Sequence, residues 1–205
     1  MNSPSPTAQT WPQILAVAYA LFDDLETKGF GIPPFSLGGG TVLMFRFQHR
    51  LSRDIDFFGY DAQWLPLLSP RLNETAAAVA SSWTEQANGV KIVMPQGDID
   101  FVIAADVALP VIRDMVTLEG REILMDPTSE ILAKKLFYRA ATLKARDVYD
   151  FSAAIDLDPG AARTAVRAAA SKGDLLVERL DHLAELRPEA LLEGLVPYAG
   201  AAARE

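Results

Sequence analysis

The spacing of hydrophobic residues changes along the chain and predicts two kinds of structure. Apolar residues between Ile14 and Leu25 recur every three or four positions, which predicts a helix. Short apolar runs follow, and the glycine and proline residues between them favour strands. Strands are predicted at 35–37, 53–58, 90–94, 99–104, 115–118 and 122–125, and further helices at 42–48 and over the alanine-rich residues 72–87.

Helical spacing replaces this pattern after Asp126. Asp126 and Pro127 suit the start of a helix, with the aspartate as cap and the proline in the first turn. Helical segments are predicted at 127–143, 147–156, 160–172, 174–186 and 188–197. The sequence therefore predicts an α+β fold, in which an α/β domain of residues 1–126 precedes a C-terminal helical bundle of residues 127–205.

Composition narrows the class of protein. The 205 residues include no cysteine, which excludes disulfides and thiolate metal sites and fits a reducing compartment. The longest apolar stretches fall short of the roughly 18 residues that a membrane span needs. The first ten residues contain no lysine or arginine, unlike a secretory signal. These features predict a cytoplasmic protein without a membrane segment.

The acidic charge is unevenly distributed. Residues 1–130 carry 8 basic and 16 acidic residues, so the whole net charge of −8 lies there, while residues 131–205 carry 11 of each. A net negative charge argues against a general nucleic-acid coat protein. Basic residues are concentrated in two groups. The first, just before two aspartates, comprises Arg46, His49, Arg50 and Arg53, and the second comprises Lys134, Lys135, Arg139, Lys144 and Arg146. Such local patches on an acidic protein suit a phosphate-bearing ligand, although solvated helix faces produce similar runs.

Two aspartates interrupt one of the predicted strands. Alternate residues of a strand share a face, so Asp54 and Asp56 point the same way with Cα atoms roughly 6–7 Å apart. Two carboxylates at this separation repel each other unless a cation lies between them. Magnesium prefers a few carboxylates, water and phosphate oxygens as ligands. The pair therefore predicts a magnesium site.

A glycine turn lies thirteen residues before the first of these aspartates. Gly39, Gly40 and Thr41 connect a predicted strand to a predicted helix, where backbone amides and the positive end of the helix bind phosphate. Alone, a glycine run is usually a turn, and an Asp-x-Asp pair is usually a solvated edge. Together and in this order they favour a nucleotide site.

Two ordered motifs extend this interpretation. The first is Gly39-Gly40-Thr41 followed by His49-Arg50-Leu51-Ser52-Arg53-Asp54-Ile55-Asp56-Phe57-Phe58, and the second is Lys135-Leu136, then Lys144, then Arg146-Asp147-Val148-Tyr149-Asp150. In order and spacing they resemble the AbiEii/AbiGii toxin family of nucleotidyltransferases, which includes the MenT toxins, within the polymerase-β-like superfamily. The resemblance covers residues 36–151 and implies a mixed-sheet nucleotidyltransferase domain followed by helices.

The resemblance also implies a set of site residues. The family has a third carboxylate on a later strand, for which Asp100 is favoured over Asp98 because Ile99 and Phe101 flank it; Asp106 is a weaker choice. The implied catalytic residues are Asp54, Asp56, Asp100, Lys135 and Asp147, of which the first three hold Mg²⁺. The implied nucleotide-binding residues are Gly39, Gly40, Thr41, Arg53, Lys135 and Arg139. For Asp147 and Asp150, the alternative is a salt-bridged start of a helix.

The implied activity is transfer of a nucleoside monophosphate from a nucleoside triphosphate to an acceptor hydroxyl. The family suggests a toxin of a toxin–antitoxin or phage-defence system, with the 3′ end of tRNA as acceptor and a cognate antitoxin as partner. Two alternatives stay open at this point. One is an antibiotic-type nucleotidyltransferase with a small-molecule acceptor, and the other is a non-catalytic nucleotide- or partner-binding protein.

Overall fold

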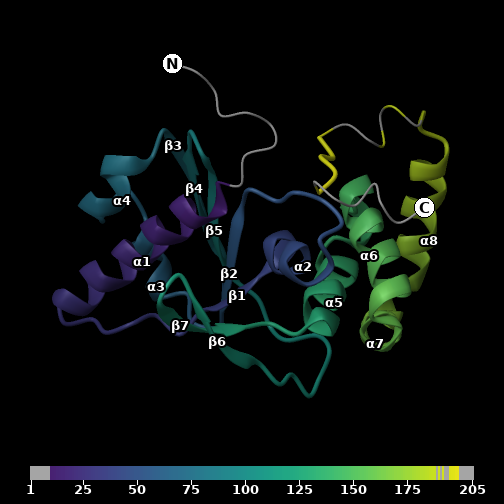
Figure 1. The fold of residues 1–205 in the computed structure, drawn as a ribbon, viewed down its shortest axis with the longest axis horizontal. Coiled ribbons are helices and arrows are strands. Elements are labelled where there is room, and N and C mark those ends of the chain that lie inside the picture. The colour runs from purple at the N-terminus through teal and green to yellow at the C-terminus, as the bar shows by residue number, and fades with distance from the viewer. Residues whose placement is uncertain (1–9, 188, 190, 192–193, 199–205) are drawn as a thin grey trace. The chain divides into compact units, whose positions relative to one another are not determined.

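The chain forms two compact units (Figure 1). The computed structural model describes residues 10–187, 189, 191 and 194–198. The first unit is built from Met1–Val42, Ser52–Ala105 and Asp114–Met125, and the second from Leu43–Leu51, Asp106–Arg113 and Asp126–Glu205. Each unit therefore assembles its core from segments that are distant in the sequence.

The first unit contains a seven-stranded sheet in the order β3-β4-β5-β2-β1-β7-β6. Strand β2 is parallel to β5 and β1 is parallel to β7, whereas the other neighbours are antiparallel. This mixed sheet confirms the predicted fold class. The strands are β1 (Ser36–Gly38), β2 (Ile55–Gly59), β3 (Ser82–Gln86), β4 (Gly89–Met94), β5 (Gly97–Ile103), β6 (Asp114–Leu118) and β7 (Arg121–Met125).

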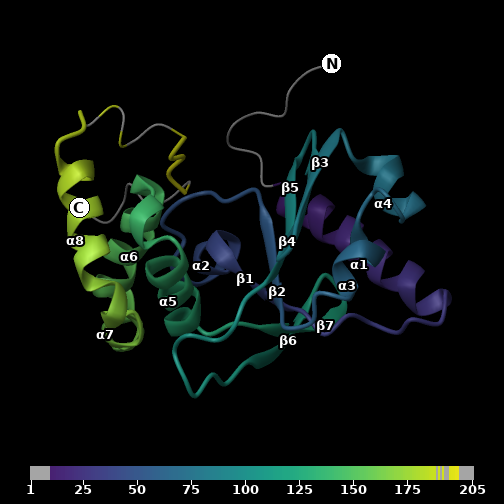
Figure 2. The same cartoon turned by 180° about the vertical axis from the view of Figure 1, so that it is seen from behind.

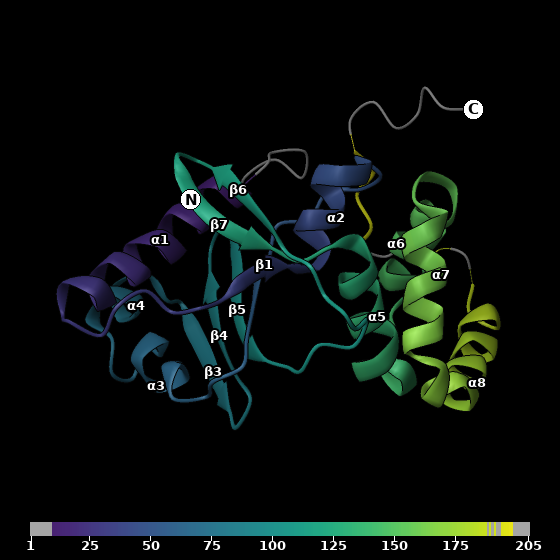
Figure 3. The same cartoon turned by 90° about the horizontal axis from the view of Figure 1, so that it is seen from below.

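One face of the central strands is apolar and supports the core. Its buried side chains alternate along β2, β4 and β5, namely Ile55, Phe57, Val90, Ile92, Met94, Ile99 and Phe101. Helix α1 (Trp11–Thr27) packs against these strands, and α3 (Trp64–Leu68) and α4 (Glu74–Val79) lie nearby (Figures 1 and 3). The Phe22 ring meets Phe57 edge-on at 5.3 Å. Each fully buried leucine, isoleucine or phenylalanine contributes about 1.5–3 kcal/mol.

The prediction of one helix over residues 72–87 is wrong in its second half. Helix α4 begins after the Asn73 cap, whose side chain accepts a hydrogen bond from the Ala76 amide at 2.9 Å, and it ends at Val79. The chain then forms the exposed edge strand β3 beside β4. Even the high helix propensity of alanine is a small effect that tertiary context overrides, and β3 itself (Ser82–Gln86) contains no alanine, so backbone pairing with β4 prevails there.

The second unit is mainly helical, as predicted for this part of the chain. Its helices are α5 (Thr128–Tyr138), α6 (Ala145–Leu157), α7 (Pro159–Ala168) and α8 (Gly173–Ala184), with short 3₁₀ turns at Ala140–Thr142 and Ala170–Lys172. Helix α5 packs along α7 (Figure 2). The helix predicted at 188–197 falls partly on residues 188, 190, 192 and 193, which lie outside the described residues. No described helix is both long and apolar enough to cross a membrane.

The prediction that Asp126 caps α5 is wrong. Pro127 occupies the cap position, and no side chain there accepts a hydrogen bond from the helix. Asp126 is instead fully buried, accepting hydrogen bonds from Arg113 Nε at 2.7 Å and Lys134 Nζ at 2.8 Å. Two charge-assisted hydrogen bonds outweigh one bond to a backbone amide. The aspartate therefore ties the loop 106–113 to α5.

Helix α2 (Gly39–Phe47) joins β1 to the segment that precedes β2, and its residues are shared between the two units. It begins three residues earlier than the sequence predicts. Gly39 starts it with a φ of +69°, a conformation that glycine adopts without strain. The helix therefore begins directly at the end of β1, where the glycine turn was expected.

Candidate active site

A row of polar residues crosses the central strands on the face opposite the apolar one. Asp56 on β2 lies beside Asp100 on the parallel strand β5, and Asp100 lies opposite Lys91 on β4. On the other side, Asp56 is paired with Gly38 of β1. Because side chains alternate along strands, these three charged groups project from the same face. The pairing brings together carboxylates that are 44 residues apart in sequence.

Asp54 joins this row from the position just before β2. Its Oδ1 accepts a weak hydrogen bond from the Asp98 amide at 3.4 Å. Its backbone carbonyl accepts a hydrogen bond from the hydroxyl of Thr41, which is fully buried. Thr41 thus fixes the backbone that carries Asp54. The structure places Asp54, Asp56 and Asp100 in one cluster, with Arg53 partly buried directly before it.

Burial and repulsion disfavour the ionised form of this cluster. Burial raises the pKa of Asp54, and the charges of Asp56 and Asp98 raise it further. Burial also raises the pKa of Asp100, with added repulsion from Asp54 and Asp98, although Lys91 opposes the shift. Excess negative charge therefore gathers at the start of β2 and the middle of β5.

Lys91 is a member of the cluster that sequence reasoning missed. Its Nζ lies 2.6 Å from Asp98 Oδ2 and 3.0 Å from Asp100 Oδ2. Burial alone would lower the pKa of Lys91, but its hydrogen bonds to Asp98 and Asp100 and their charges outweigh this effect and raise it. A signal existed, because Lys91 is the one charged residue in the strand predicted at 90–94, which is next in sequence to the strand predicted at 99–104 that carries Asp100.

The cluster suits a divalent cation by its donor type and charge. Among the described residues, no group of three or more His, Cys, Asp and Glu side chains is already arranged to hold a metal ion. The oxygen donors of Asp54, Asp56 and Asp100 are nevertheless those that magnesium prefers. A cation would also relieve the repulsion that raises the pKa of Asp54 and Asp100. The residues present therefore fit such an ion.

The glycine turn lies directly against this cluster. A Cβ atom on Gly39 would come within 1.8 Å of Asp56 Oδ2. The carboxylate therefore approaches the first residue of α2, where the partial positive charge of a helix start favours an anion. Gly39 and Gly40 are both buried. The Asp56 carboxylate therefore packs against the turn that the sequence predicts to bind phosphate.

Gly39→Ala is expected to destabilise the protein more than the same substitution at another glycine with a positive φ. Gly120 has a similar positive φ of +80°, but open space surrounds its would-be Cβ. Gly120→Ala should therefore show backbone strain alone, at about 1–2 kcal/mol. Gly39→Ala adds the clash with Asp56, so thermal melts should show a larger loss. Equal losses for the two variants would contradict the close approach.

The predicted residues of the second unit form a cluster of their own. Lys135 Nζ lies 2.6 Å from Asp147 Oδ1, and Arg139 Nη1 lies 3.3 Å from the same oxygen. The other carboxylate oxygen of Asp147 accepts a hydrogen bond from the Lys144 amide at 3.2 Å, at the start of α6. Burial would raise the pKa of Asp147, but Lys135 and Arg139 outweigh it and lower the pKa. Asp147 therefore both pairs with Lys135 and stabilises a helix start.

Asp150 anchors a buried group of cations beside this cluster. It accepts hydrogen bonds from Arg50 Nε at 2.6 Å and Nη2 at 2.8 Å. His49 Nε2 lies 2.7 Å from the same carboxylate, and Lys135 Nζ lies 3.2 Å away. The His49 ring stacks on Tyr149 at 5.6 Å, and its buried Nδ1 has no hydrogen-bond partner among the described residues. These contacts give Asp150 a structural role in the second unit.

The basic run from Lys134 to Arg146 is not a continuous exposed patch. Lys134 and Lys135 are buried and ion-paired, the former with Asp126 and the latter with Asp147. The two lysines serve separate networks because neighbouring helical residues point about 100° apart. Lys144 and Arg146 are exposed. Fewer cations are therefore available for a nucleic acid than the sequence alone indicates.

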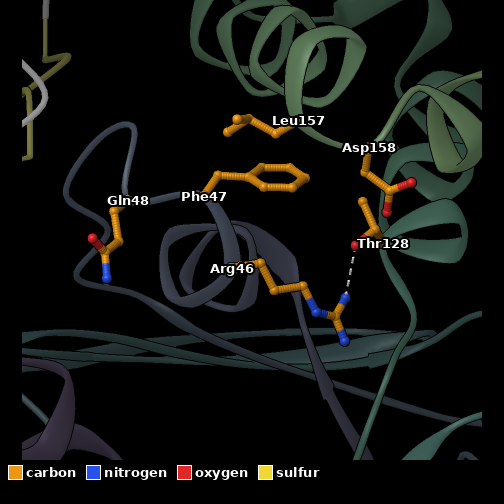
Figure 4. Close-up of a pocket in the computed structure, with 6 residues that line it drawn as sticks. All are labelled: Arg46, Phe47, Gln48, Thr128, Leu157 and Asp158. Atoms are coloured by element: carbon orange, nitrogen blue, oxygen red, sulfur yellow. Dashed lines mark hydrogen bonds between the residues drawn. The ribbon is translucent and has the colours of Figure 1, made fainter. Parts of the chain in front are cut away.

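A polar cavity of about 480 Å³ also lies in the second unit (Figure 4). Arg46 Nη1 donates a hydrogen bond to Thr128 Oγ1 across its wall at 3.1 Å. The lining residues are Arg46, Phe47, Gln48, Thr128, Leu157 and Asp158, none of which is a predicted site residue. The Asp158 side chain also caps α7 through the Ala161 amide.

Comparisons with known proteins point to one family. The family model of the nucleotidyl transferase AbiEii toxin of type IV toxin–antitoxin systems matches residues 21–198. No curated protein matches the sequence. Among solved structures, the antibiotic-resistance factor ANT(2″)-Ia has a TM-score of 0.54 and 14% identity, with coverage of 84% of this chain and 99% of that chain. This likeness shows a shared fold.

A second structure is the nucleotidyltransferase toxin MenT4 from Mycobacterium tuberculosis. It is 18% identical, with a TM-score of 0.49, and the comparison covers 92% of this chain and 78% of that chain.

Proposed function

The chain belongs to the AbiEii family of nucleotidyl transferase toxins, as its motifs predict, and from this premise we propose that it transfers a nucleoside monophosphate to an acceptor hydroxyl in a magnesium-dependent reaction. The observation that carries the proposal is the pairing of Asp56 with Asp100 on neighbouring strands, with Asp54 directly before β2. Such a group of carboxylates is suited to a divalent cation and a polyphosphate.

The proposed reaction is an in-line displacement. The acceptor oxygen forms a bond to the α-phosphorus of the nucleoside triphosphate, and the bond from that phosphorus to the oxygen bridging to the β-phosphate breaks. Pyrophosphate leaves, and the hydroxyl proton passes to water. Asp54, Asp56 and Asp100 would hold the magnesium ion, which supplies positive charge to the attacking oxygen and the leaving group.

The chain's own groups would bind and orient the nucleotide. The start of α2, at Gly39 and Gly40, offers backbone amides for a phosphate. Thr41 would act indirectly, because its hydroxyl holds the Asp54 carbonyl. Lys135 and Arg139 would balance phosphate charge, and Asp147 would keep Lys135 oriented. Arg53 is a further candidate for a phosphate contact.

For the acceptor we propose the 3′ end of tRNA. The family description supports a toxin of a toxin–antitoxin system. We propose a cognate antitoxin as its partner and the cytoplasm as its place of action. Exposed Lys144 and Arg146 provide cations for an RNA phosphate on the helical segment that follows Lys135. The net charge of −8 predicts that the contact with RNA is confined to a short part of the molecule.

Labelled substrates test this function. The protein is incubated with each α-labelled nucleoside triphosphate and magnesium, with total tRNA, an aminoglycoside or no acceptor. We expect label on tRNA with at least one nucleotide, and loss of this signal on chelation of magnesium. Label on the aminoglycoside instead would indicate an antibiotic-type enzyme. Nucleotide binding without transfer to any acceptor would indicate a binding protein and contradict the proposal.

A further inference from the structure

Lys91 contacts two carboxylates that have different places in the cluster. Asp100 lies beside Asp56, and both are proposed metal ligands. Asp98 lies two residues earlier on β5 and is paired with Val93 of β4. Lys91 Nζ contacts both, at 2.6 Å from Asp98 and 3.0 Å from Asp100. The ammonium group therefore bridges a proposed ligand and a carboxylate next to it.

The three side chains have room to rearrange. Exposed fractions are 36% for the Lys91 side chain, 23% for Asp98 and 25% for Asp100. A lysine ammonium is a point charge on a flexible stem, so it can shift between neighbouring oxygens at little cost. A divalent cation at Asp100 would repel it, whereas Asp98 would still hold it. This arrangement offers the lysine a second partner when Asp100 is taken.

We propose that Lys91 is an internal counter-ion that competes with the metal for Asp100 and moves fully onto Asp98 when the metal binds. The inference rests on the proposed function, because it assumes that Asp54, Asp56 and Asp100 bind the cation. It assigns the two candidates for the third carboxylate different tasks. Asp100 is the ligand, and Asp98 holds the displaced lysine. Lys91 thereby lowers the affinity for the metal and protects the metal-free cluster from its own repulsion.

Removing the ammonium group should strengthen metal binding. The full-length protein is titrated with Mn²⁺, a paramagnetic ion with similar oxygen ligands, and the free ion is measured by electron paramagnetic resonance. Lys91→Gln is expected to bind Mn²⁺ about tenfold more tightly, since a nearby like charge has been removed. The melting temperature of Lys91→Gln without metal should be lower than that of wild type. Mg²⁺ should raise the melting temperature of this variant more than that of wild type.

A second variant should have the opposite effect. Asp98→Asn leaves Lys91 with Asp100 as its carboxylate partner, so Mn²⁺ binding should weaken several-fold. In the double variant the lysine is absent, so Asp98→Asn should weaken Mn²⁺ binding much less than it does when Lys91 is present. This dependence of one substitution on the other is the signature of a shared ammonium group. The control is Lys28→Gln, which removes an exposed lysine paired with Asp24 at 2.7 Å. It should change neither the Mn²⁺ affinity nor the melting temperature.

The outcomes separate this inference from the function on which it rests. Mn²⁺ binding that disappears in Asp56→Asn but is unchanged or weaker in Lys91→Gln overturns the role of Lys91 and leaves the metal site standing. Equal affinities of Asp98→Asn and wild type overturn the role of Asp98. Binding that survives in Asp56→Asn argues against the proposed metal ligands, and absence of binding in both wild type and Lys91→Gln overturns both proposals.

Discussion

Replacing Asp56 by asparagine is expected to lower the rate of nucleotidyl transfer at least about 10³-fold while the protein stays folded. Asp56 lies beside Asp100 in the row of polar residues and against the start of α2. Asparagine keeps the size of the side chain but removes the charge that would bind the cation. The measurement is the rate of label transfer from an α-labelled nucleoside triphosphate under saturating magnesium.

The stability of the same variant distinguishes a functional carboxylate from a structural one. The pKa of Asp54 is raised partly by the charge of Asp56, so the ionised cluster destabilises the folded protein. When folding raises the pKa of a carboxyl group, the folded protein loses stability as the pH rises from the ordinary pKa of that group, about 3.9, through the raised pKa. At neutral pH, Asp56→Asn should therefore melt at or about 2 °C above wild type.

The matched control is Asp114→Asn, because Asp114 is an exposed aspartate on strand β6 of the same sheet. It should change neither activity nor melting temperature. The fall in melting temperature between acid and neutral pH that the ionised cluster causes should also be smaller in Asp56→Asn than in wild type. A variant that keeps most of its transfer activity, or that melts several degrees below wild type at neutral pH, would contradict the role assigned to Asp56.

Local patterns in the sequence were sufficient for part of this site. Alternation along one predicted strand placed Asp54 and Asp56 together. The glycine turn predicted a helix after β1, although α2 begins within that turn, at Gly39. Asp100 was reached through the family resemblance and its apolar neighbours. The adjacency of Asp56 and Asp100 required the pairing of β2 with β5, and the intervening β3 and β4 lie elsewhere in the sheet. Such non-local pairing is not encoded in the spacing of either strand.

Side-chain partners from distant segments account for what the sequence did not predict. Asp126 had the position and residue type of a helix cap, but its carboxylate accepts hydrogen bonds from Arg113 and Lys134 instead. Lys134 and Lys135 looked alike in the sequence, although one binds Asp126 and the other binds Asp147. Propensity and charge patterns describe a residue and its neighbours along the chain. They do not identify which buried charge will meet it after folding.

Asp150→Ala is expected to be among the most destabilising single substitutions in the second unit. The Asp150 carboxylate is fully buried and accepts two hydrogen bonds from Arg50, while His49 and Lys135 also contact it. Removing one partner of a buried ion pair costs about 3–5 kcal/mol, because the other charge stays desolvated. For a protein of this size the melting temperature should fall by roughly 10 °C.

The pH dependence of this loss has a definite sign. Burial would raise the pKa of Asp150, but the hydrogen bonds and charges from His49, Lys135 and Arg50 hold it well below its ordinary value. Its contribution to stability is therefore complete above the ordinary value of about 3.9 and declines as pH falls below it. The difference in melting temperature between wild type and Asp150→Ala should be constant near neutral pH and shrink towards the acid end.

Asp150→Asn separates charge from shape in the same position. The amide can still accept hydrogen bonds through its oxygen, but it cannot neutralise Arg50, so its melting temperature should lie between those of Asp150→Ala and wild type. Activity at low temperature, where both variants stay folded, tests whether Asp150 acts through Lys135. Asp147 still pairs with Lys135 at 2.6 Å, so folded Asp150→Asn should keep most of its transfer rate. An Asp150→Ala melt within 2 °C of wild type would show that these buried charges do not stabilise the fold.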